Sequence, residues 1–467
     1  MELRNFCALK KVPHAGLSIQ EEQKRWLREF LKAFFAVFIV YAAMYLIRNN
    51  LKAAGPLLMK QYGFTTSQLG FIGVGFSFTY AIGKTVLGYF VDGRNAKKFI
   101  SIMLMVSSII VFLMGLWLLI MHSYTPALMV MWALSGFCQA PGGPASYSTI
   151  SRWTPETKRG RWLGFWNVSH NIGGAFAGIL ALWGANLFFG GNAAGMFIVP
   201  AVVAFVISIV GMKLGKDDPE ELGWDPAPVI WQEDDKQIDE EREDTEKLTK
   251  WQVFVKYVLR NPWVWMLAIA NIFIYIVRIG IDNWVPIYSE QVLGFTNAQA
   301  VDTLFFFEMG ALVGSLSWGW LSDLLKGRRM VTALISVVLE LGAIFIYSHT
   351  HSVMGLYAVL AVLGWLVFGP QLLIGVSVVG FVPGEAISVT NGITGTCAYL
   401  FGDSLAKAAL GVIADRKGNG LSLFGIHLHG WHDVFLIFYI SLIIGGILML
   451  IVAFAEEKRI RAIEKAN

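Results

Sequence analysis

Tyr45-Leu46-Ile47-Arg48 lies inside a long apolar stretch, and the similar run Tyr275-Ile276-Val277-Arg278 lies inside another one about 230 residues later. An arginine within a lipid-spanning helix costs about 2.5–3.5 kcal/mol on insertion scales, so it usually faces a cavity and has a function. Two such arginines at corresponding places of an internal repeat predict one anion-binding site built from both halves of the chain. The alternative for each is a side chain that snorkels towards the membrane surface.

The composition indicates a protein embedded in a membrane. The chain has 467 residues, of which 55% are hydrophobic and 15% charged, whereas soluble proteins carry about 25% charged residues. Apolar runs of roughly 20 residues, each long enough to cross a bilayer as a helix, recur along the sequence. They predict an all-α protein with twelve transmembrane helices, at about 30–54, 67–91, 99–121, 126–151, 161–188, 195–214, 262–288, 299–322, 330–348, 353–382, 386–413 and 431–455.

The spans predict five regions along the chain. They are an N-terminal tail (1–29), a first six-helix bundle (30–214), an acidic central linker (215–261), a second six-helix bundle (262–455) and a C-terminal tail (456–467). Lys and Arg gather in the loops after the second, fourth and eighth spans, and the loops after the third, fifth and ninth contain none. Because basic loops mark the cytoplasmic side, both termini and the linker are expected inside the cell.

A repeat relates the two bundles beyond the arginines. Gly88-x-x-x-Asp92 matches Gly319-x-x-x-Asp323, and Pro141 matches Pro370, all at offsets of about 228–231 residues. Both halves begin and end on the same side, which predicts parallel repeats with a substrate site near the midplane between them. We interpret the two Gly-x-x-x-Asp loops as conformational latches on the cytoplasmic face. Their gating residues are expected to be Asp92, Arg94, Asp323 and Arg328.

Three further cationic or polar positions lie inside the first bundle. Lys84 is the one charge in the second span and is a candidate third cation for an anionic substrate, the alternative being a structural ion pair. On the fifth span, Asn167, His170 and Asn171 share one face by their three- and four-residue spacing. A histidine there can donate a hydrogen bond to phosphate, and the alternative is a hydrogen bond between packed helices.

The second bundle contributes polar candidates of its own. Glu308 is expected to pair with a cation such as Arg278 or to contact sugar hydroxyls. Asp403 and Lys407 lie four residues apart, so they either neutralise each other or line the path of a hydroxylated substrate. His427, His429 and His432 do not have the spacing of a zinc site, so no metal is expected. No nucleophile–base or paired-carboxylate pattern predicts an enzyme, no cofactor is indicated, and the sequence offers no nucleic-acid surface.

Several longer motifs resemble the organophosphate:phosphate antiporters of the major facilitator superfamily. They are Arg152-Trp153-Thr154-Pro155, Leu163-Gly164-Phe165-Trp166-Asn167, Val277-Arg278-Ile279-Gly280-Ile281-Asp282-Asn283-Trp284 and Phe368-Gly369-Pro370-Gln371. The resemblance covers nearly the whole chain and is strongest to the hexose-phosphate branch. It implies the major facilitator fold, phosphate held by Arg48 and Arg278, substrate binding by Lys84 and His170, and a cavity lined by Tyr45 and Tyr275.

The resemblance implies exchange of external hexose 6-phosphate, glucose 6-phosphate in particular, for internal inorganic phosphate across a bacterial inner membrane, by a monomer. Some hexose-phosphate members carry an Asp and a Lys where this chain has Asn391 and Thr394, which makes the sugar preference less secure than the phosphate chemistry. The alternatives are a membrane sensor of sugar phosphate, an antiporter for glycerol 3-phosphate or another organophosphate, and, more remotely, a membrane phosphatase.

Overall fold

The computed structural model describes residues 7–91, 94–121, 125–231, 250–383, 386–423 and 425–466. These residues are mostly helical, with one hairpin in which β1 (Leu421–Leu423) pairs antiparallel with β2 (Ile426–Leu428). The chain divides into two compact units. Unit 1 comprises residues 1–62 and 78–234, and unit 2 comprises residues 63–77 and 235–467.

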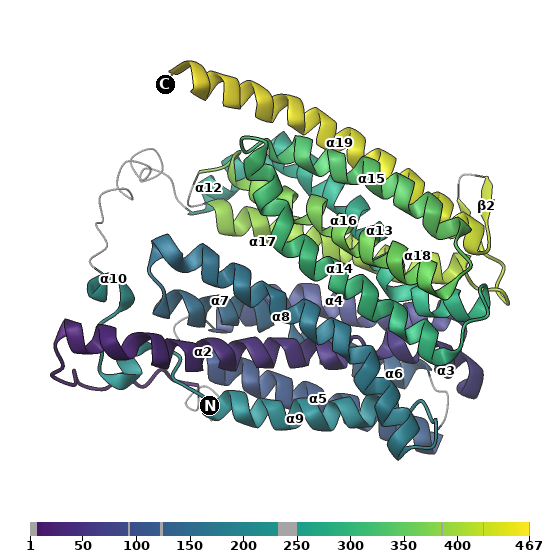
Figure 1. Ribbon diagram of the computed structural model, residues 1–467, viewed down its shortest axis with the longest axis horizontal. Helices are drawn as coiled ribbons and strands as arrows, with labels where there is room; N and C mark the ends of the chain where they lie inside the picture. Colours follow the sequence, from purple (N-terminus) through teal and green to yellow (C-terminus); the bar gives the residue numbers. More distant parts are fainter. Residues whose placement is uncertain are drawn as a thin grey trace. The chain divides into compact units, whose positions relative to one another are not determined.

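Unit 1 contains the helices of the first half of the chain, purple to teal in Figure 1. They are α2 (Ile19–Arg48), α3 (Asn50–Tyr62), α4 (Thr66–Val91), whose first residues belong to unit 2, α5 (Ala96–Met121), α6 (Thr125–Gln139), α7 (Gly142–Trp153), α8 (Glu156–Trp183), the π-helical η1 (Gly184–Phe188), α9 (Gly195–Lys213), η2 (Pro219–Leu222) and α10 (Ala227–Ile230). Helix α2 packs against α8 and α9, and α5 packs against α9.

Unit 2 contains the remaining elements, green to yellow in Figure 1. They are α12 (Lys250–Phe254), the π-helical η3 (Val255–Leu259), α13 (Pro262–Gln291), α14 (Asn297–Leu324), α15 (Arg329–His349), α16 (Val353–Val379), α17 (Ile387–Cys397), the π-helical η5 (Ala398–Asp403), α18 (Ser404–Ile413), the hairpin, and α19 (Trp431–Ala466). Helix α16 packs between α14 and α15, and α19 packs against α13 and α15.

The predicted spans correspond to these helices, with one interruption that explains their count. Among the described residues, eleven helical stretches are long and apolar enough to cross a membrane. The fourth predicted span is not among them because it is broken between α6 and α7, and neither part reaches the length of a span. Pro141 lies at this break, where its ring and missing N–H end the regular helix. With α6 and α7 taken as one span, the prediction of twelve is confirmed.

Small residues bring helices into close contact inside each unit. A Cβ atom on Gly173 of α8 would lie 2.1 Å from the carbonyl oxygen of Ala42 on α2. In unit 2, a Cβ on Gly310 of α14 would lie 1.9 Å from the carbonyl oxygen of Ala361 on α16. Glycine is therefore required at both contacts, as is usual where membrane helices pack tightly.

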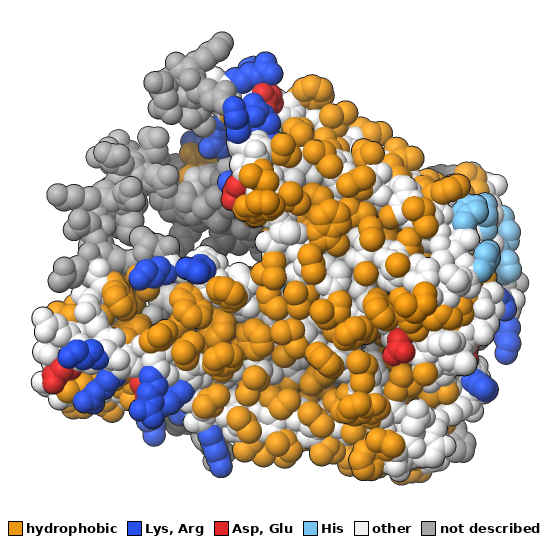
Figure 2. Space-filling model, in the orientation of Figure 1, with side chains coloured by type: hydrophobic (Ala, Val, Ile, Leu, Met, Phe, Trp, Pro, Cys, Tyr) orange, Lys and Arg blue, Asp and Glu red, His pale blue; other side chains and the backbone are white. Residues whose placement is uncertain are grey.

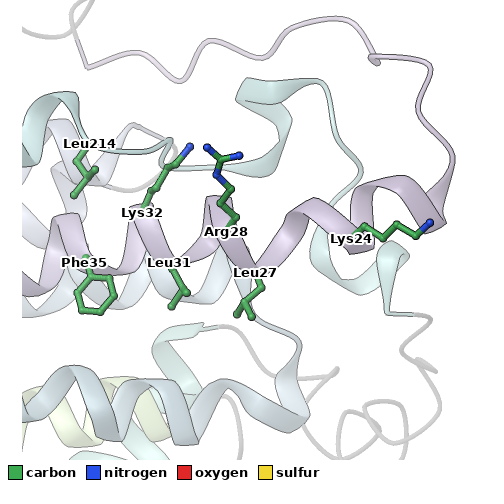
Figure 3. A pocket seen from close by; sticks show the side chains of 7 residues that line it. All are labelled: Lys24, Leu27, Arg28, Leu31, Lys32, Phe35 and Leu214. Carbon is green, nitrogen blue, oxygen red and sulfur yellow. The ribbon is translucent and has the colours of Figure 1, made fainter.

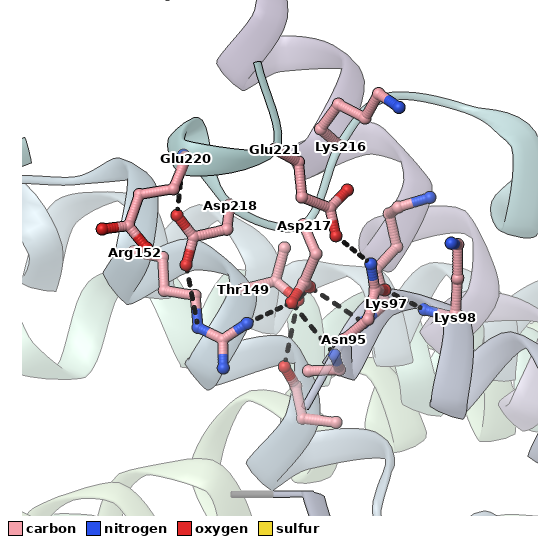
Figure 4. A network of polar contacts seen from close by, with 12 residues as sticks. Asn95, Lys97, Lys98, Thr149, Arg152, Lys216, Asp217, Asp218, Glu220 and Glu221 are labelled. Carbon is pink, nitrogen blue, oxygen red and sulfur yellow. Dashed lines mark hydrogen bonds and ion pairs between the residues drawn. The ribbon is translucent and has the colours of Figure 1, made fainter. Parts of the chain in front are cut away.

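In unit 1, a buried carboxylate joins three helix ends (Figure 4). Asp217, in the turn after α9, accepts hydrogen bonds from the backbone N–H groups of Ala96 (3.0 Å) and Lys97 (2.9 Å), which satisfy the first turn of α5. It also accepts from Thr149 Oγ1 (2.6 Å) and pairs with Arg152, both on α7. The predicted linker therefore begins with a residue packed into unit 1.

Unit 2 has a similar anchor at Glu456 of α19. Its carboxylate accepts from the N–H of Met330 (2.8 Å), in the first turn of α15, and from Ser377 Oγ (3.2 Å) on α16. Ser377 lies 228 residues after Thr149, which is an offset of the sequence repeat. Both units thus fix the start of their third span and the end of their fourth span with one buried carboxylate. The predicted linker residues Glu240, Glu241, Glu243 and Asp244 lie outside the described residues.

Candidate functional site

In unit 1, the side chain of Arg48 lies between aromatic rings and an amide. Its Nε donates to Oε1 of Gln139 at 3.1 Å. Its guanidinium carbon lies 4.4 Å from the ring centroid of Tyr45 and 4.4 Å from that of Tyr80. Arg48 is the last residue of α2, before the interruption at Asn49. A guanidinium close to two ring faces is stabilised by their negative quadrupoles, and its planar N–H fork matches the geometry of an oxyanion.

Gln139 is in turn held by two hydroxyl groups. Its Nε2 donates to Ser107 Oγ (3.0 Å) and Ser135 Oγ (3.2 Å), which lie 2.8 Å from each other. These hydrogen bonds leave Oε1 as the acceptor that faces Arg48. Because all three side chains are fully buried, the amide cannot turn without losing partners. Gln139 was not among the residues predicted from the sequence, although a glutamine near Pro141 in an apolar span was a visible signal.

The other cationic and polar candidates of unit 1 extend from the same cluster. The ring of His170 lies 5.2 Å from that of Tyr45, and the histidine is 7% exposed. Lys84 is half-buried on α4, one turn after Tyr80, and acts electrostatically on the Tyr80 hydroxyl, as Arg48 does. Asn167 is half-buried on α8, one turn before His170. In unit 1, therefore, Arg48, Lys84 and His170 are linked by two tyrosines, Tyr45 and Tyr80.

Unit 2 builds a related site around Arg278 of α13. Nη1 of Arg278 donates to Oε1 of Gln371 on α16, and Nε2 of Gln371 donates to the hydroxyl of Tyr275 at 3.1 Å. The guanidinium carbon lies 4.2 Å from the ring centroid of Phe368 and 5.7 Å from that of Tyr275. Tyr275 also contacts Tyr399 edge-on, with ring centroids 5.4 Å apart. Arg278, Tyr275, Gln371 and Phe368 thus form one cluster.

The two glutamines do not occupy equivalent positions of the repeat. Gln139 precedes Pro141 by two residues, whereas Gln371 directly follows Pro370. In the register of the prolines, the residue equivalent to Gln139 is Phe368, which covers Arg278 with its ring. The two amides are therefore displaced by three residues, which is about one helical turn. A search limited to the repeat register could not find this pair.

Asp403 and Lys407 pair with each other in unit 2. Lys407 Nζ lies 2.6 Å from Asp403 Oδ1, and Ser77 Oγ bridges them at 3.0 Å from Asp403 and 2.7 Å from Lys407. Asp403 is the last residue of η5, and π-helical turns are frequent at functional sites. The mutual pairing expected from their spacing is confirmed, and contact with a substrate stays a prediction.

Glu308 lies on the buried face of α14, 6% exposed, two residues before Gly310. Its pairing with Arg278 or with a sugar hydroxyl stays a prediction. Of the two positions that bear on sugar preference, Asn391 is exposed within unit 2 and Thr394 is buried. Thr394 Oγ1 donates to the carbonyl oxygens of Thr390 and Asn391, each at 3.1 Å, so its hydroxyl is used within α17.

The predicted gating residues are described in part. Asp92 lies outside the described residues. Arg94 donates to the carbonyl oxygen of Phe90 and covers its ring at 3.8 Å, while Asp323 is exposed near the end of α14. Arg328 forms a two-pronged pair with Glu457 of α19, with Nε–Oε2 at 2.7 Å and Nη2–Oε1 at 3.2 Å. Glu457, which the sequence analysis did not single out, therefore fixes Arg328, and a role of these residues as latches stays a prediction.

Among the described residues, one group brings three metal-ligating side chains together. His14 Nε2 lies 3.5 Å from Glu22 Oε1 and 3.8 Å from Asp225 Oδ1. However, His14 Nδ1 accepts a hydrogen bond from the Gly16 N–H at 3.0 Å. Nε2 faces the carboxylates, but a metal-bound histidine normally donates from its other ring nitrogen, and Nδ1 here accepts instead. This cluster therefore fits a contact between the imidazole and two carboxylates better than a metal site.

Comparison with known proteins identifies the relatives of this chain. The profile of the Major Facilitator Superfamily matches residues 34–406. A hexose-6-phosphate:phosphate antiporter of Escherichia coli (strain K12) is 46% identical over 456 residues, 97% of this chain and 96% of the relative. A phosphoglycerate transporter protein of Salmonella typhimurium is 32% identical over 85% of this chain and 86% of the relative. Among solved structures, an inward-facing bacterial homolog of the human lysosomal transporter Spinster has a TM-score of 0.63 at 16% identity, covering 91% of this chain and 96% of that one.

Proposed function

The chain belongs to the Major Facilitator Superfamily and, within it, to the organophosphate:phosphate antiporters, and we propose that it exchanges external hexose 6-phosphate for internal inorganic phosphate. Glucose 6-phosphate is the proposed sugar phosphate. The proposal rests on the 46% identity over nearly the whole length to an antiporter of that name. The all-α fold with two six-helix halves fits a secondary transporter and not an enzyme.

One observation supports the phosphate chemistry more than any other. Each unit holds one arginine on a spanning helix, oriented by a glutamine and covered by aromatic rings. A guanidinium offers parallel N–H donors that match two oxygens of a phosphoryl group, which an ammonium cannot do. We propose that Arg48 and Arg278 both contact the transported phosphoryl group. Phosphate and a phosphate ester share this group, so one site serves both substrates.

The remaining candidates take roles that follow from their chemistry. Lys84 and His170 add a cation and a hydrogen-bond donor near the Arg48 cluster, and Tyr45 and Tyr275 line the path. Asn167, Glu308 and the Asp403–Lys407 pair are proposed to contact the sugar. A bound anion neutralises the cationic site and favours closure around it, so exchange needs no ATP.

The proposed location is the bacterial inner membrane. The proposed orientation has both termini and the central linker in the cytoplasm, because basic loops mark that side. Residues 30–214 and 262–455 are the proposed bundles, with Asp92, Arg94, Asp323 and Arg328 as latches on the cytoplasmic side. The proposed oligomeric state is a monomer, because a single chain contains every residue assigned to the site.

Proteoliposomes loaded with phosphate test this function. We expect uptake of labelled glucose 6-phosphate only when phosphate is inside, and labelled phosphate efflux only when an organophosphate or phosphate is outside. Efflux that ignores the external substrate would contradict exchange. Uptake that fails while binding persists would instead favour a sensor of sugar phosphate.

A different organophosphate is the second candidate substrate. The 32% identity to a phosphoglycerate transporter protein shows that related chains carry other phosphate esters. Since Asn391 and Thr394 replace a charged pair of some hexose-phosphate members, the ester group is the less constrained part of the substrate. Competition of glucose 6-phosphate, glycerol 3-phosphate and phosphoglycerate against labelled phosphate decides among them.

A further inference from the structure

A groove on the surface of unit 1 combines basic and apolar side chains, apart from the proposed substrate site. It has a volume of about 560 Å³. Six of its residues come from α2 and one from the turn after α9, and they are Lys24, Leu27, Arg28, Leu31, Lys32, Phe35 and Leu214. We call it the basic groove. Figure 2 shows Lys and Arg side chains gathered beside hydrophobic ones over the start of α2.

The order of residues in α2 makes the groove amphipathic. Lys24, Arg28 and Lys32 follow one another at intervals of four, and so do Leu27, Leu31 and Phe35. This spacing places each series along one side of a helix. In Figure 3 the nitrogens of Arg28 and Lys32 extend towards the segment of Leu214, whereas Leu27, Leu31 and Phe35 extend in the opposite direction. The groove therefore combines a row of cations with an apolar strip on the same helix.

The charge of the groove is positive after its internal ion pair is counted. Lys32 Nζ lies 2.6 Å from Glu29 Oε1, which offsets that lysine. Lys24 and Arg28 are exposed, and the neighbouring Arg25 adds another exposed cation. A bound anion therefore meets Arg28 first, and Lys24 adds charge one helical turn earlier. Lys32 contributes less to anion binding, because its ammonium group pairs with Glu29.

The wall opposite α2 is fixed by a tight turn. Gly215 has φ +65°, a backbone conformation that favours glycine. A Cβ atom there would lie 2.6 Å from the backbone nitrogen of Ala33 and 2.7 Å from the carbonyl carbon of Lys32. The chain thus leaves α9 pressed against α2. Leu214 is held in the groove by this contact, so the site is formed without a ligand.

We propose that the basic groove binds an anionic phospholipid, with the headgroup phosphate at Arg28, flanked by Lys24 and Lys32 in the same series, and an acyl chain along Leu27, Leu31 and Phe35. A free phosphate would leave the apolar strip unused, whereas a lipid contacts both parts. Phe35 is 49% exposed and Leu27 is 57% exposed, and α2 continues from them directly into an apolar span. Basic clusters of this kind beside a span attract the anionic leaflet. The proposal needs the chain to lie in a membrane but does not depend on the transported substrate.

Native mass spectrometry of the purified full-length protein tests the proposal without a transport assay. The protein in detergent is mixed with equal amounts of phosphatidylglycerol and phosphatidylcholine, and retained lipid is counted. We expect the wild type to retain phosphatidylglycerol preferentially. The combined variant Lys24→Gln, Arg28→Gln, Lys32→Gln should lose this preference by about tenfold or more, since each basic residue near a lipid surface contributes about fivefold.

A matched variant separates a built site from general attraction. Lys60→Gln, Lys326→Gln, Lys417→Gln removes three exposed charges elsewhere and should keep the preference within about twofold of the wild type. Equal loss in both variants, or no loss in the groove variant, would overturn the proposal. Displacement of phosphatidylglycerol by millimolar inorganic phosphate would overturn it too, by making the groove a simple phosphate site. Circular dichroism of both variants identifies any that fail to fold, and Leu31→Asn, which keeps all charges but breaks the apolar strip, then replaces the failed variant with the same expected loss.

Discussion

The clusters around Arg48 and Arg278 are made of the same groups arranged in different ways. Both arginines bind the amide oxygen of a glutamine and lie against aromatic rings. In unit 1 the glutamine is the last residue of α6, at the break, and two serines hold it. In unit 2 the glutamine lies inside the unbroken α16, and Tyr275 of α13 holds it. The repeat has therefore kept the chemistry while its register shifted by one helical turn. Residues with equal roles need not be residues with equal repeat positions.

The largest expected effect comes from the arginines themselves. Arg48→Lys and Arg278→Lys should each lower exchange by about a hundredfold or more, because an ammonium cannot bind two phosphoryl oxygens at once. Phosphate exchange in proteoliposomes measures the loss, with membrane insertion checked for both variants. If one variant transports nearly normally, the two sites are not equivalent and the comparison fails for that unit.

The glutamines should separate binding from stability. Gln371→Ala removes the amide that bonds Arg278 and Tyr275 and should weaken substrate binding by about tenfold, but because Gln371 is only half-buried it should lower stability by less than about 1 kcal/mol. Gln139→Ala should weaken binding to a similar extent and also lower stability by about 1–2 kcal/mol, because Ser107 and Ser135 lose a buried partner. Binding of labelled phosphate and thermal unfolding are measured on the same preparations. Equal stability of the two variants would contradict the difference described between the clusters.

The two carboxylate anchors give a second contrast. Asp217→Asn should destabilise the protein by about 3 kcal/mol, since the amide cannot replace a buried charge that pairs with Arg152 and accepts two backbone N–H groups. Glu456→Gln should cost about 1 kcal/mol, because the groups that hydrogen-bond to its carboxylate, Met330 N–H and Ser377, are neutral. Thermal unfolding in detergent compares them. A larger loss for Glu456→Gln would reverse the ranking.

Removal of the Phe368 ring over Arg278 is expected to have the next smaller effect on binding. Phe368→Leu removes the aromatic face 4.2 Å from the guanidinium and should weaken phosphate binding by about threefold to tenfold. Phe368→Tyr keeps the face and is the control, with binding close to the wild type. Because Phe368 stands at the repeat position of Gln139, the variant Phe368→Gln tests whether an amide at this position can replace the aromatic ring. Wild-type binding by Phe368→Leu would show that the ring only fills space.

The smallest effect is a pH dependence in the loop after α9. Burial raises the pKa of Glu221 above its usual value of 4.5, so its folded form prefers the proton more than the unfolded chain does. The stability from this preference is present below the usual pKa and is lost as pH rises through the raised one. Glu221→Gln should remove the dependence and, at neutral pH, leave the protein as stable or more stable by less than about 1 kcal/mol. A variant with the wild-type pH profile of thermal unfolding would contradict this assignment.

The sequence predicted the helices well because their signal is local. Runs of apolar residues long enough to span a bilayer are visible without any knowledge of packing, and α5, α9 and α13 agree with the predicted spans within three residues at either end. The break at Pro141 was missed because a proline in an apolar span does not by itself predict a break. Its repeat partner, Pro370, lies inside α16, which is unbroken. Whether a proline ends a helix depends on the packing that surrounds it, which the sequence does not display.

Within the candidate site, the charged residues gave the clearest signal in the sequence. Arg48, Arg278, Lys84 and the Asp403–Lys407 pair were identified because ionised groups in apolar spans are rare. The partners that orient them, Gln139, Gln371 and Ser77, are uncharged and come from distant parts of the chain. No spacing rule connects such residues, so three-dimensional packing was needed to find them. Asp217 and Glu456 were missed for the same reason, since each acts through backbone groups far away in the sequence.

The central claim, that Arg48 and Arg278 hold one phosphoryl group together, is tested most directly by a double-mutant cycle of phosphate binding. Labelled phosphate binding is measured for the wild type, Arg48→Lys, Arg278→Lys and the double variant, each checked for folding by circular dichroism. If both arginines grip the same anion, either single change should lose nearly as much affinity as the double change. Losses that simply add, or a single variant that retains wild-type affinity, would contradict the claim.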